Sequence, residues 1–370
     1  MKNSGILIFM FTFASVIWLG AFVGILALKK LGLLSGTLLV VSHIVAILIP
    51  IILVNTLRAG YLSWSPLNAA LHTASGGYVV IIIGFFMAAM FFGLLYAVLV
   101  HFGITTLSTK AVGGLILAGT LLHAGYGFAN AGIIRQKEVV LSVPADSALI
   151  GKRVALVSDL YLGMTHRQRF AKKVSQSINA TNPDIVIIAG DLIDGPKIPY
   201  KETLAPLGEI KAPLGVYFVP GNHEQYNVEQ ADFYAAIPKN ITTLSDEVTA
   251  LDGVTLMGVD YTSETEEQLA KRLDQWAPGT TPDIAVIHDP KLREVLGDRG
   301  AQVVLSGHTH GGQLFPSTAL VKMIYKEKSS GLVSKDATHY FTTVGIGTGG
   351  VPARTRTKPE VVTFTFVAQQ

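Results

Sequence analysis

The first 130 residues of the chain contain no aspartate or glutamate, and this absence limits how they can fold. Within them lie four apolar stretches, at residues 5–28, 33–57, 78–100 and 111–129. Each is close to the roughly 20 residues that a helix needs to cross the hydrocarbon core of a bilayer. One such stretch could be a cleaved secretory signal, but four in succession cannot all be one. The sequence therefore predicts a transmembrane domain of four helices over residues 1–131.

Basic residues near the ends of these stretches indicate an orientation. An even number of crossings puts both ends of the domain on one side of the membrane. That side carries four basic residues and the other carries three: Lys2, Arg58, Arg135 and Lys137 against Lys29, Lys30 and Lys110. The positive-inside rule then favours the cytoplasm for both ends. Between the second and third stretches, residues 59–77 include Tyr61 and Trp64, and we expect them to form an interfacial loop or a half-inserted segment.

The remainder of the chain has the composition of a soluble domain. The whole chain has 29 basic and 26 acidic residues, and five of the basic ones lie in the first 130 residues, so the remainder has 24 against 26. Because this part has no cationic excess, nucleic-acid binding is not expected. The absence of cysteine excludes disulfides and thiolate ligands. We expect residues 132–152 to form a linker and a first strand, and residues 153–370 to form one domain with its own core.

Polar turns follow four apolar runs in this domain. The runs lie at residues 154–157, 185–189, 216–219 and 303–305, and they read as buried parallel strands. The turns that follow them are Ser158-Asp159-Leu160-Tyr161, Gly190-Asp191, Gly221-Asn222-His223-Glu224 and Gly307-His308-Thr309-His310. Helical patterns between the early runs, and later runs with little helix between them, indicate two packed sheets flanked by helices.

These turns combine carboxylate, amide and imidazole groups. The turn after a parallel strand is where α/β folds place their chemistry, so these side chains are expected to meet at one rim of one sheet. Oxygen and nitrogen donors of this kind bind divalent metal ions. A pair of such ions can activate a water for attack on phosphorus. The sequence therefore predicts a metal-dependent hydrolase.

Together the motifs resemble those of the calcineurin-like metallophosphoesterases. The family pattern is Asp-x-His, Gly-Asp, Gly-Asn-His-Glu, a lone His and then Gly-His-x-His, and His288 stands at the lone position. The resemblance covers the soluble domain, nearly two-thirds of the chain, and residues 308–313 and 345–350 look like a bacterial branch that includes membrane-associated enzymes. It implies a four-layer αββα sandwich with the metal site at the strand ends. Together with the four apolar stretches and the basic residues at their ends, this branch leads us to expect a multipass protein of the bacterial inner membrane, with the soluble domain in the cytoplasm.

The resemblance implies two divalent ions, as Mn, Zn or Fe, and a role for each residue. The six metal ligands would be Asp159, Asp191, Asn222, His288, His308 and His310. Asp191 would bridge the two ions, because one carboxylate has two oxygens, and the ions would lie about 3.5–4 Å apart. Asp159 and His310 would hold the first ion, and the other three would hold the second.

Catalysis would combine a metal-activated hydroxide with two side chains of the domain. The hydroxide would attack phosphorus in line, between ions that Asp191 bridges. His223 follows a ligand directly and would protonate the leaving oxygen or stabilise the charge that develops on it. Arg354, in the family-like tail, is expected to contact the phosphate. Asp289 and Glu224 are candidates for orienting the ligand imidazoles.

Tyr161 departs from the family pattern, which has histidine at this position as a ligand of the first ion. Tyrosine is a poor ligand unless it is ionised, and its free pKa is about 10. Three outcomes are open. Tyr161 binds as a phenolate to a hard ion such as Fe(III), or it stands aside and leaves a weakened but working first site, or the first site is empty and the protein is slow or inactive.

The predicted function is hydrolysis of a phosphomonoester or a phosphodiester at a membrane. Proximity to the bilayer favours a phospholipid or nucleotide-lipid substrate, such as a lipid-linked phosphate or a nucleotide-lipid pyrophosphate. A cyclic-nucleotide or general phosphodiesterase is the alternative among enzymes. A non-catalytic membrane sensor or scaffold with a degenerate metal site is the alternative of another class, and Tyr161 is the feature that supports it. The sequence leaves the oligomeric state open.

Overall fold

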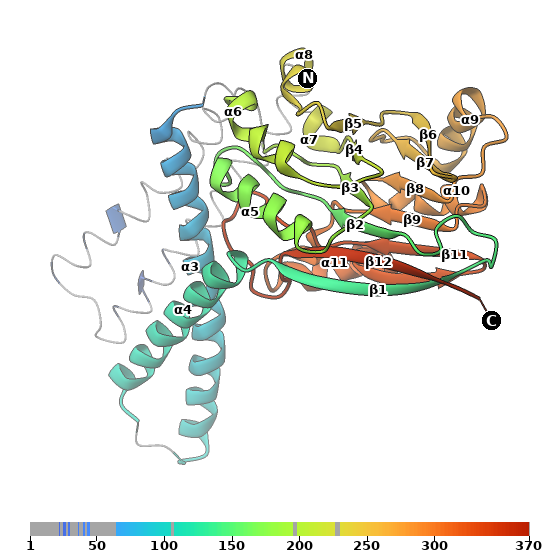
Figure 1. Ribbon diagram of the computed structural model, residues 1–370. Helices are drawn as coiled ribbons and strands as arrows, with labels where there is room; N and C mark the ends of the chain where they lie inside the picture. Colours follow the sequence, from blue (N-terminus) through green and yellow to red (C-terminus); the bar gives the residue numbers. More distant parts are fainter. Residues whose placement is uncertain are drawn as a thin grey trace. The chain divides into compact units, whose positions relative to one another are not determined.

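The computed structural model describes residues 64–104, 107–194, 198–225 and 230–369, together with scattered positions between 22 and 44. The chain divides into two compact units (Figure 1). The first consists of Met1–Ala129 with Gly350–Ala353, and the second of Asn130–Gly349 with Arg354–Gln370. Each unit is described by itself below.

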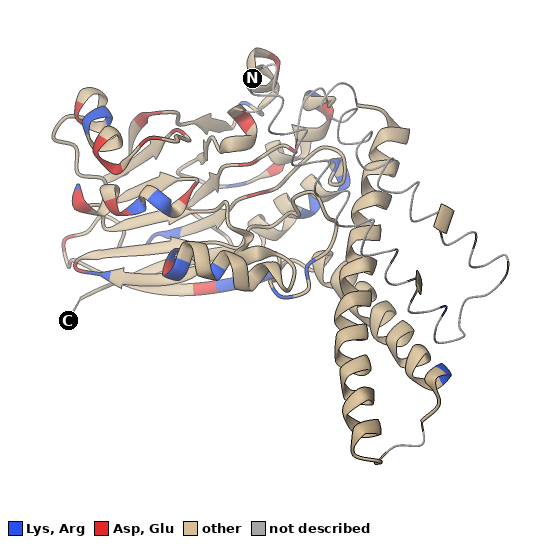
Figure 2. Cartoon of the chain, turned by 180° about the vertical axis from the view of Figure 1, so that it is seen from behind, with Lys and Arg blue, Asp and Glu red and all other residues tan. Residues whose placement is uncertain are grey.

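Two long helices make up most of the first unit's described part. They are α3 (Pro66–His101) and α4 (Thr109–Ala131), and both are long and apolar enough to cross a membrane. Figure 2 shows how sparse fixed charge is along them, in contrast to the second unit. The predicted spans at 78–100 and 111–129 lie inside these helices. The predicted spans at 5–28 and 33–57 lie outside the described residues, apart from the scattered positions.

The start of α3 corrects one of the two alternatives predicted for residues 59–77, the interfacial loop, over the part from Pro66 onward. From Pro66 onward this segment is helical and continues without a break into the apolar span. The Oγ of Ser65 accepts the backbone N–H of Asn68 at 3.1 Å, and proline occupies the first turn, where its missing N–H is harmless. The helix therefore begins about three turns before residue 78, where the predicted apolar span starts.

Two six-stranded sheets form the second unit. The first sheet has the order β1-β12-β2-β3-β4-β5, and the second has the order β10-β11-β9-β8-β7-β6. The strands of the first sheet are β1 (Arg135–Val143), β12 (Glu360–Ala368), β2 (Arg153–Val157), β3 (Ile185–Ala189), β4 (Val216–Val219) and β5 (Ile241–Thr243). Those of the second are β10 (Gly331–Lys335), β11 (Thr338–Thr342), β9 (Val303–Ser306), β8 (Ile284–Ile287), β7 (Val254–Val259) and β6 (Glu247–Leu251).

Parallel pairing dominates the centre of both sheets. Strands β2 to β5 run parallel in the first sheet, and β11, β9, β8 and β7 run parallel in the second. In the first sheet β12 lies antiparallel to β2 and parallel to β1, so the domain's first and last strands pair over their whole length. In the second sheet β10 and β6 form antiparallel edges.

The two sheets pack face to face and carry helices on their outer sides (Figure 1). One continuous apolar core contains inward residues of both sheets, among them Leu156, Ile187, Leu256, Val286 and Phe364. The helices are α5 (Gln168–Asn179), α6 (Tyr200–Leu204), α8 (Gln230–Ala236), α9 (Glu266–Trp276) and α10 (Arg293–Asp298). An apolar stripe on α9 packs with outward residues of β7 and β8 in a second core. The predicted four-layer α/β sandwich is therefore what this unit forms.

Candidate metal centre

Five turns of the second unit meet at one edge, and each follows the end of a parallel strand. The turns after β2, β3 and β4 come from the first sheet, and the turns after β8 and β9 come from the second. Parallel strands place their carboxyl ends together, so residues far apart in the sequence converge there. Asn222 begins the short helix α7 (Asn222–Gln225) after β4. The site thus lies where the two sheets face each other.

Several of these turn residues have left-handed backbone conformations. The φ angles are 55° at Asp159, 50° at Tyr161, 52° at Asp191, 72° at His308 and 51° at His310. Such a conformation costs about 1–3 kcal/mol for a residue other than glycine, and such residues cluster at functional sites. The clustering of five of them around one edge indicates that the surrounding packing holds these side chains in fixed directions.

Glycine is required at two positions in these turns. A Cβ at Gly190 would collide with the His288 ring, and a Cβ at Gly221 would collide with Asp191. Gly190 also has a φ of 84°. Glycine therefore lets the turns after β3 and β4 approach the candidate ligands closely.

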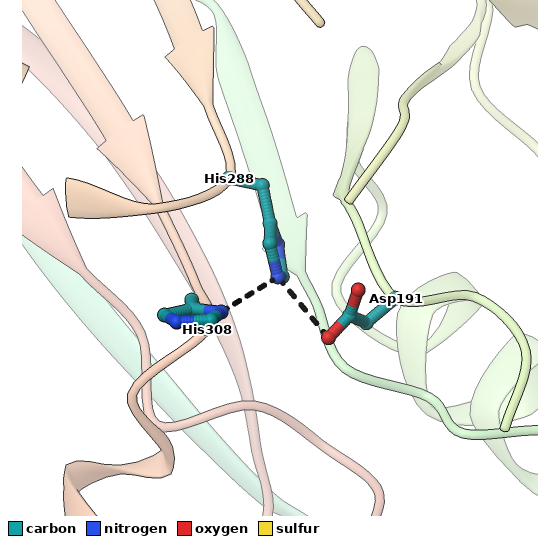
Figure 3. Close-up of side chains that lie close together, drawn as sticks. All are labelled: Asp191, His288 and His308. Atoms are coloured by element: carbon teal, nitrogen blue, oxygen red, sulfur yellow. Dashed lines mark hydrogen bonds and ion pairs between the residues drawn. The ribbon is translucent and has the colours of Figure 1, made fainter. Parts of the chain in front are cut away.

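Asp191, His288 and His308 form the tightest cluster (Figure 3). Their candidate ligand atoms all lie within 4.8 Å of one another. His288 lies between the other two side chains, with its Nε2 3.1 Å from Asp191 Oδ2 and 3.3 Å from His308 Nδ1. His288 Nδ1 lies 2.7 Å from the carbonyl oxygen of Ala189, which can only accept, so Nδ1–H donates to it and fixes the ring.

Electrostatics show that this cluster attracts positive charge. Burial lowers the pKa of His288, but the carboxylates of Asp191 and Asp159 and the hydrogen bonds to Asp191 and Ala189 together outweigh burial and raise the pKa to about 10. Burial alone would raise the pKa of Asp191, but His288 and His223 hold it below its ordinary value. The buried carboxylate thus draws a proton onto its neighbour when no other cation is present. A divalent cation would supply this charge more directly.

Two buried oxygens of the site have no hydrogen-bond partner among the described residues. They are Asn222 Oδ1 and Asp159 Oδ1. An unpaired buried acceptor costs about 1–3 kcal/mol, so a native structure normally fills such a position. Asn222 Oδ1, with the three-residue cluster, fits the four-ligand set of a divalent cation. The position that the family assigns to its second ion therefore fits a metal.

The position that the family assigns to its first ion has a different set of contacts. Tyr161 Oη donates to Asp191 Oδ2 at 2.8 Å and lies 3.2 Å from His310 Nε2. Burial raises the pKa of Tyr161 well above its usual value, and the carboxylates of Asp191 and Asp159 act in the same direction. The side chain is therefore a neutral phenol, which is a poor ligand. His310 Nε2 lies 3.4 Å from Asp159 Oδ1.

Arg354 does not face the phosphate position that the sequence predicted for it. Its guanidinium is fully buried, and all its N–H groups have acceptors. Nε and Nη2 donate to Gly347 O, Nη1 donates to Val344 O and Thr357 Oγ1, and Nη2 also lies 3.3 Å from His310 Nδ1. The prediction of a phosphate contact is therefore wrong. Arg354 has no donor left over, and it instead holds the His310 ring and the tail.

Glu224 joins two ligand turns rather than orienting an imidazole. Its buried carboxylate accepts four backbone N–H groups, those of Asp191, Leu192, Ile193 and Gly221, at 2.7–3.3 Å. Burial raises the pKa of Glu224 to about 7, and the Asp191 carboxylate acts in the same direction. The turns after β3 and β4 are thus tied to one side chain. Asp289, the other candidate, has its Oδ2 3.7 Å from His308 Nε2.

We expect Glu224→Gln to destabilise the domain by about 2–3 kcal/mol, because one carboxylate oxygen becomes an N–H₂ group that faces backbone donors. Thermal unfolding of the detergent-solubilised chain, followed by circular dichroism, would measure the change. Glu209→Gln, at an exposed glutamate, is the matched control and should leave the unfolding temperature unchanged. Equal unfolding temperatures for the two variants would contradict the role given to Glu224.

Three neighbours of the site carried no recognisable signal in the sequence. Ser158 Oγ donates to Asp159 Oδ2, and the rings of Tyr261 and Tyr325 lie 6.4 Å and 6.2 Å from the His308 ring. Ser158 was visible as part of the first turn, but a serine before an aspartate is too common to indicate a contact. The two tyrosines lie outside every motif.

The chain is similar in sequence to known proteins. Residues 152–312 match the family model of the calcineurin-like phosphoesterases. An uncharacterized metallophosphoesterase of Helicobacter pylori is 31% identical over 207 residues, which cover 55% of this chain and 56% of that protein. A transmembrane protein with a metallophosphoesterase domain of Danio rerio is 29% identical over 269 residues, covering 67% of this chain and 61% of that protein.

A shorter relative is covered almost completely. The uncharacterized metallophosphoesterase YkuE of Bacillus subtilis is 27% identical over 286 residues, which cover 70% of this chain and 95% of that protein. The chain spans little more than half the length of the Helicobacter relative and about three-fifths of the Danio relative. The family match confirms the resemblance drawn from the motifs. Residues 152–312 carry a calcineurin-like phosphoesterase domain, and the chain is similar through it to these bacterial metallophosphoesterases.

Proposed function

We propose that the chain is a membrane-bound, metal-dependent phosphoesterase. The observation that carries the proposal is the largely buried cluster of Asp191, His288 and His308, together with the unpaired buried oxygen of Asn222 at the start of α7. These four side chains would hold Mn(II), Zn(II) or Fe. A bound ion of this kind supplies positive charge for phosphoryl oxygens and lowers the pKa of a water that it binds.

The chain's own groups around the cluster support a hydrolytic role. The backbone N–H of His223 donates to Asp191 Oδ1 at 2.9 Å, which fixes the start of α7 against the carboxylate. The His223 ring lies edge-on to the Tyr161 ring at 4.7 Å and is partly exposed to solvent. The ring is thus held beside the site while one side stays open. We assign it the role of proton donor to the leaving oxygen.

A lipid-linked substrate is favoured by helix α11 (Ser317–Tyr325), which follows the ligand turn of β9. None of its residues is buried, and Leu320, Met323 and Ile324 are 53%, 70% and 59% exposed on one face. Lys322 on the same helix is exposed as well. An apolar face beside a basic residue is typical of a helix that lies in a membrane interface.

The neighbourhood of α11 links this face to the site. The ring of Tyr325, its last residue, lies 6.2 Å from the His308 ring. A phosphoester whose acyl chains contact α11 would therefore present its headgroup near the cluster. With two helices long and apolar enough to cross a bilayer, we propose a multipass protein of a bacterial inner membrane with this domain in the cytoplasm.

A substrate panel tests the function. The full chain, purified in detergent and supplied with Mn(II), should hydrolyse phosphoesters, and addition of EDTA should abolish the reaction. Phosphatidic acid or a nucleotide-diacylglycerol pyrophosphate in mixed micelles should give a kcat/KM about 10-fold or more above that of p-nitrophenyl phosphate or a soluble diester, because remote binding energy contributes. Cleavage of cyclic nucleotides alone would favour the general phosphodiesterase. Bound metal without any hydrolysis would favour the sensor or scaffold.

A further inference from the structure

We infer that this chain holds one metal ion, at Asp191, Asn222, His288 and His308. At the position where the family binds its first ion, the His310 side chain is engaged in hydrogen bonds with Arg354 and Tyr161, and neither His310 nor Tyr161 is available as a metal ligand. The inference rests on the proposed function for the presence of a metal at the site. It goes beyond that function because it sets the number of ions and assigns roles to Tyr161, which departs from the family pattern, and to Arg354, which was expected to contact the phosphate.

The first step concerns the side of His310 that faces Arg354. A guanidinium has N–H donors and no acceptor. Arg354 Nη2 lies 3.3 Å from His310 Nδ1, so Nδ1 must be the accepting nitrogen of this pair. A neutral imidazole has one N–H and one lone pair. The proton of His310 is therefore on Nε2.

The second step follows from what Nε2 faces. It lies 3.2 Å from Tyr161 Oη, which accepts its N–H, and 3.4 Å from Asp159 Oδ1, with which it makes no hydrogen bond. A histidine binds a metal through a nitrogen lone pair, and the hydrogen bond at the other nitrogen selects which one is available. In His288 the other nitrogen donates to a carbonyl oxygen, which leaves Nε2 free. In His310 the nitrogen that faces Arg354 is the acceptor, so Nε2 carries the proton and has no lone pair for a metal.

The third step concerns Tyr161, where the family has a ligand histidine. Its hydroxyl donates to Asp191 Oδ2 at 2.8 Å and lies within reach of the His310 N–H. The oxygen thus acts as donor on one side and acceptor on the other. Among the donors of the first position, only Asp159 Oδ1 remains without a hydrogen bond. One carboxylate oxygen beside a shared Asp191 does not complete a metal site.

Charge balance agrees with this arrangement. Asp159 and Asp191 are both fully buried, and buried carboxylates need nearby positive charge. The guanidinium of Arg354 is buried in the same region; burial lowers its pKa to about 10, and the Asp159 carboxylate acts in the opposite direction. A fixed guanidinium therefore supplies part of the charge that a second cation supplies elsewhere. A single divalent ion provides the rest.

Metal counting tests the inference on the full chain in detergent. The protein is loaded with Mn(II), desalted, and measured by elemental analysis and electron paramagnetic resonance. We expect about one ion per chain and the spectrum of an isolated Mn(II), where a two-metal site would give about two exchange-coupled ions. Tyr161→His should raise the count to about two. Tyr161→Phe, which removes the hydroxyl but cannot ligate, is the matched control and should stay at one.

Two results would overturn the inference. One is an exchange-coupled pair of Mn(II) ions in the unmodified chain. The other is a second ion that Tyr161→Phe removes, since the phenol would then be a ligand. Measuring hydrolysis on the same preparation distinguishes a failure of this inference from a failure of the proposed function. One bound ion without hydrolysis would sink the function and leave the count standing, while two ions with hydrolysis would do the reverse.

Discussion

Asp191→Asn is expected to lower kcat/KM by on the order of 10³-fold. The carboxylate contacts His288, Tyr161 and the backbone of His223 at 2.8–3.1 Å. An amide carries no charge for a cation, and its N–H₂ group would face one of the donors that the carboxylate now accepts. The bound ion should be lost together with the activity. Steady-state kinetics and elemental analysis of the same preparation would measure both.

Asp274→Asn is the matched control for this substitution. Asp274 lies on α9 with an exposed carboxylate that pairs with Arg299 at the surface, away from every ligand turn. It should change neither the ion content nor the rate. If Asp191→Asn kept its ion and its activity while folding normally, the cluster would not be the catalytic site.

His223→Ala should lower kcat by about 10²- to 10⁴-fold, the range for loss of a general acid, while the ion content stays the same. The side chain lies against the Tyr161 ring and is assigned no ligand role. The loss should be small for substrates with a p-nitrophenolate leaving group and large for alkyl esters, because only a poor leaving group needs a proton. Comparing the two substrate classes therefore distinguishes proton donation from a general structural defect.

His339→Ala provides the control for His223. His339 lies on β11, is only partly buried, and contacts Ser334 and the backbone of Ser142. It should leave kcat unchanged for both substrate classes. A His223→Ala variant that lost its ion, or that lost activity equally on both classes, would contradict the role of proton donor.

The candidate site was largely predictable because its residues follow strand ends. An apolar run followed by a polar turn can be read locally, and parallel pairing then aligns the ends of β2, β3 and β4 in one sheet and of β8 and β9 in the other. The prediction of one rim of one sheet was wrong in this respect, because the site lies where two sheets face each other. Asp191, His288 and His308 were expected to share a site, and they lie within ligand distance of one another. Their roles as ligands stay a prediction for the metal experiments.

The direction of the Arg354 side chain was not predictable, because it depends on contacts that no local sequence pattern indicates. Near a phosphate site, an arginine in a glycine-rich tail is expected to face the substrate. Its actual direction depends on acceptors at Gly347, Val344 and Thr357, which only the folded tail brings together. No local pattern indicates that a charged side chain will be fully buried. The apolar face of α11 was missed in the same way, because its exposure depends on what the rest of the domain leaves uncovered.

Among the described residues, the apolar stretches of the two long helices were predicted well, and the start of the first helix was predicted poorly. Hydropathy found the spans inside α3 and α4. It did not extend α3 back to Pro66, because the capping contact of Ser65 concerns backbone donors rather than apolar surface. A polar start and an apolar continuation can belong to one helix.

The pairing of β1 with β12 determines when this domain can fold during synthesis. Strand β12 is inserted between β1 and β2, yet its residues are translated some 200 positions after theirs. The helices α3 and α4 emerge from the ribosome well before it. Until residues 360–368 have been made, the backbone groups of β1 lack a neighbour and one side of β2 stays open. Nascent chains halted before that point would carry two unpaired strand edges, which are prone to aggregation unless a chaperone covers them.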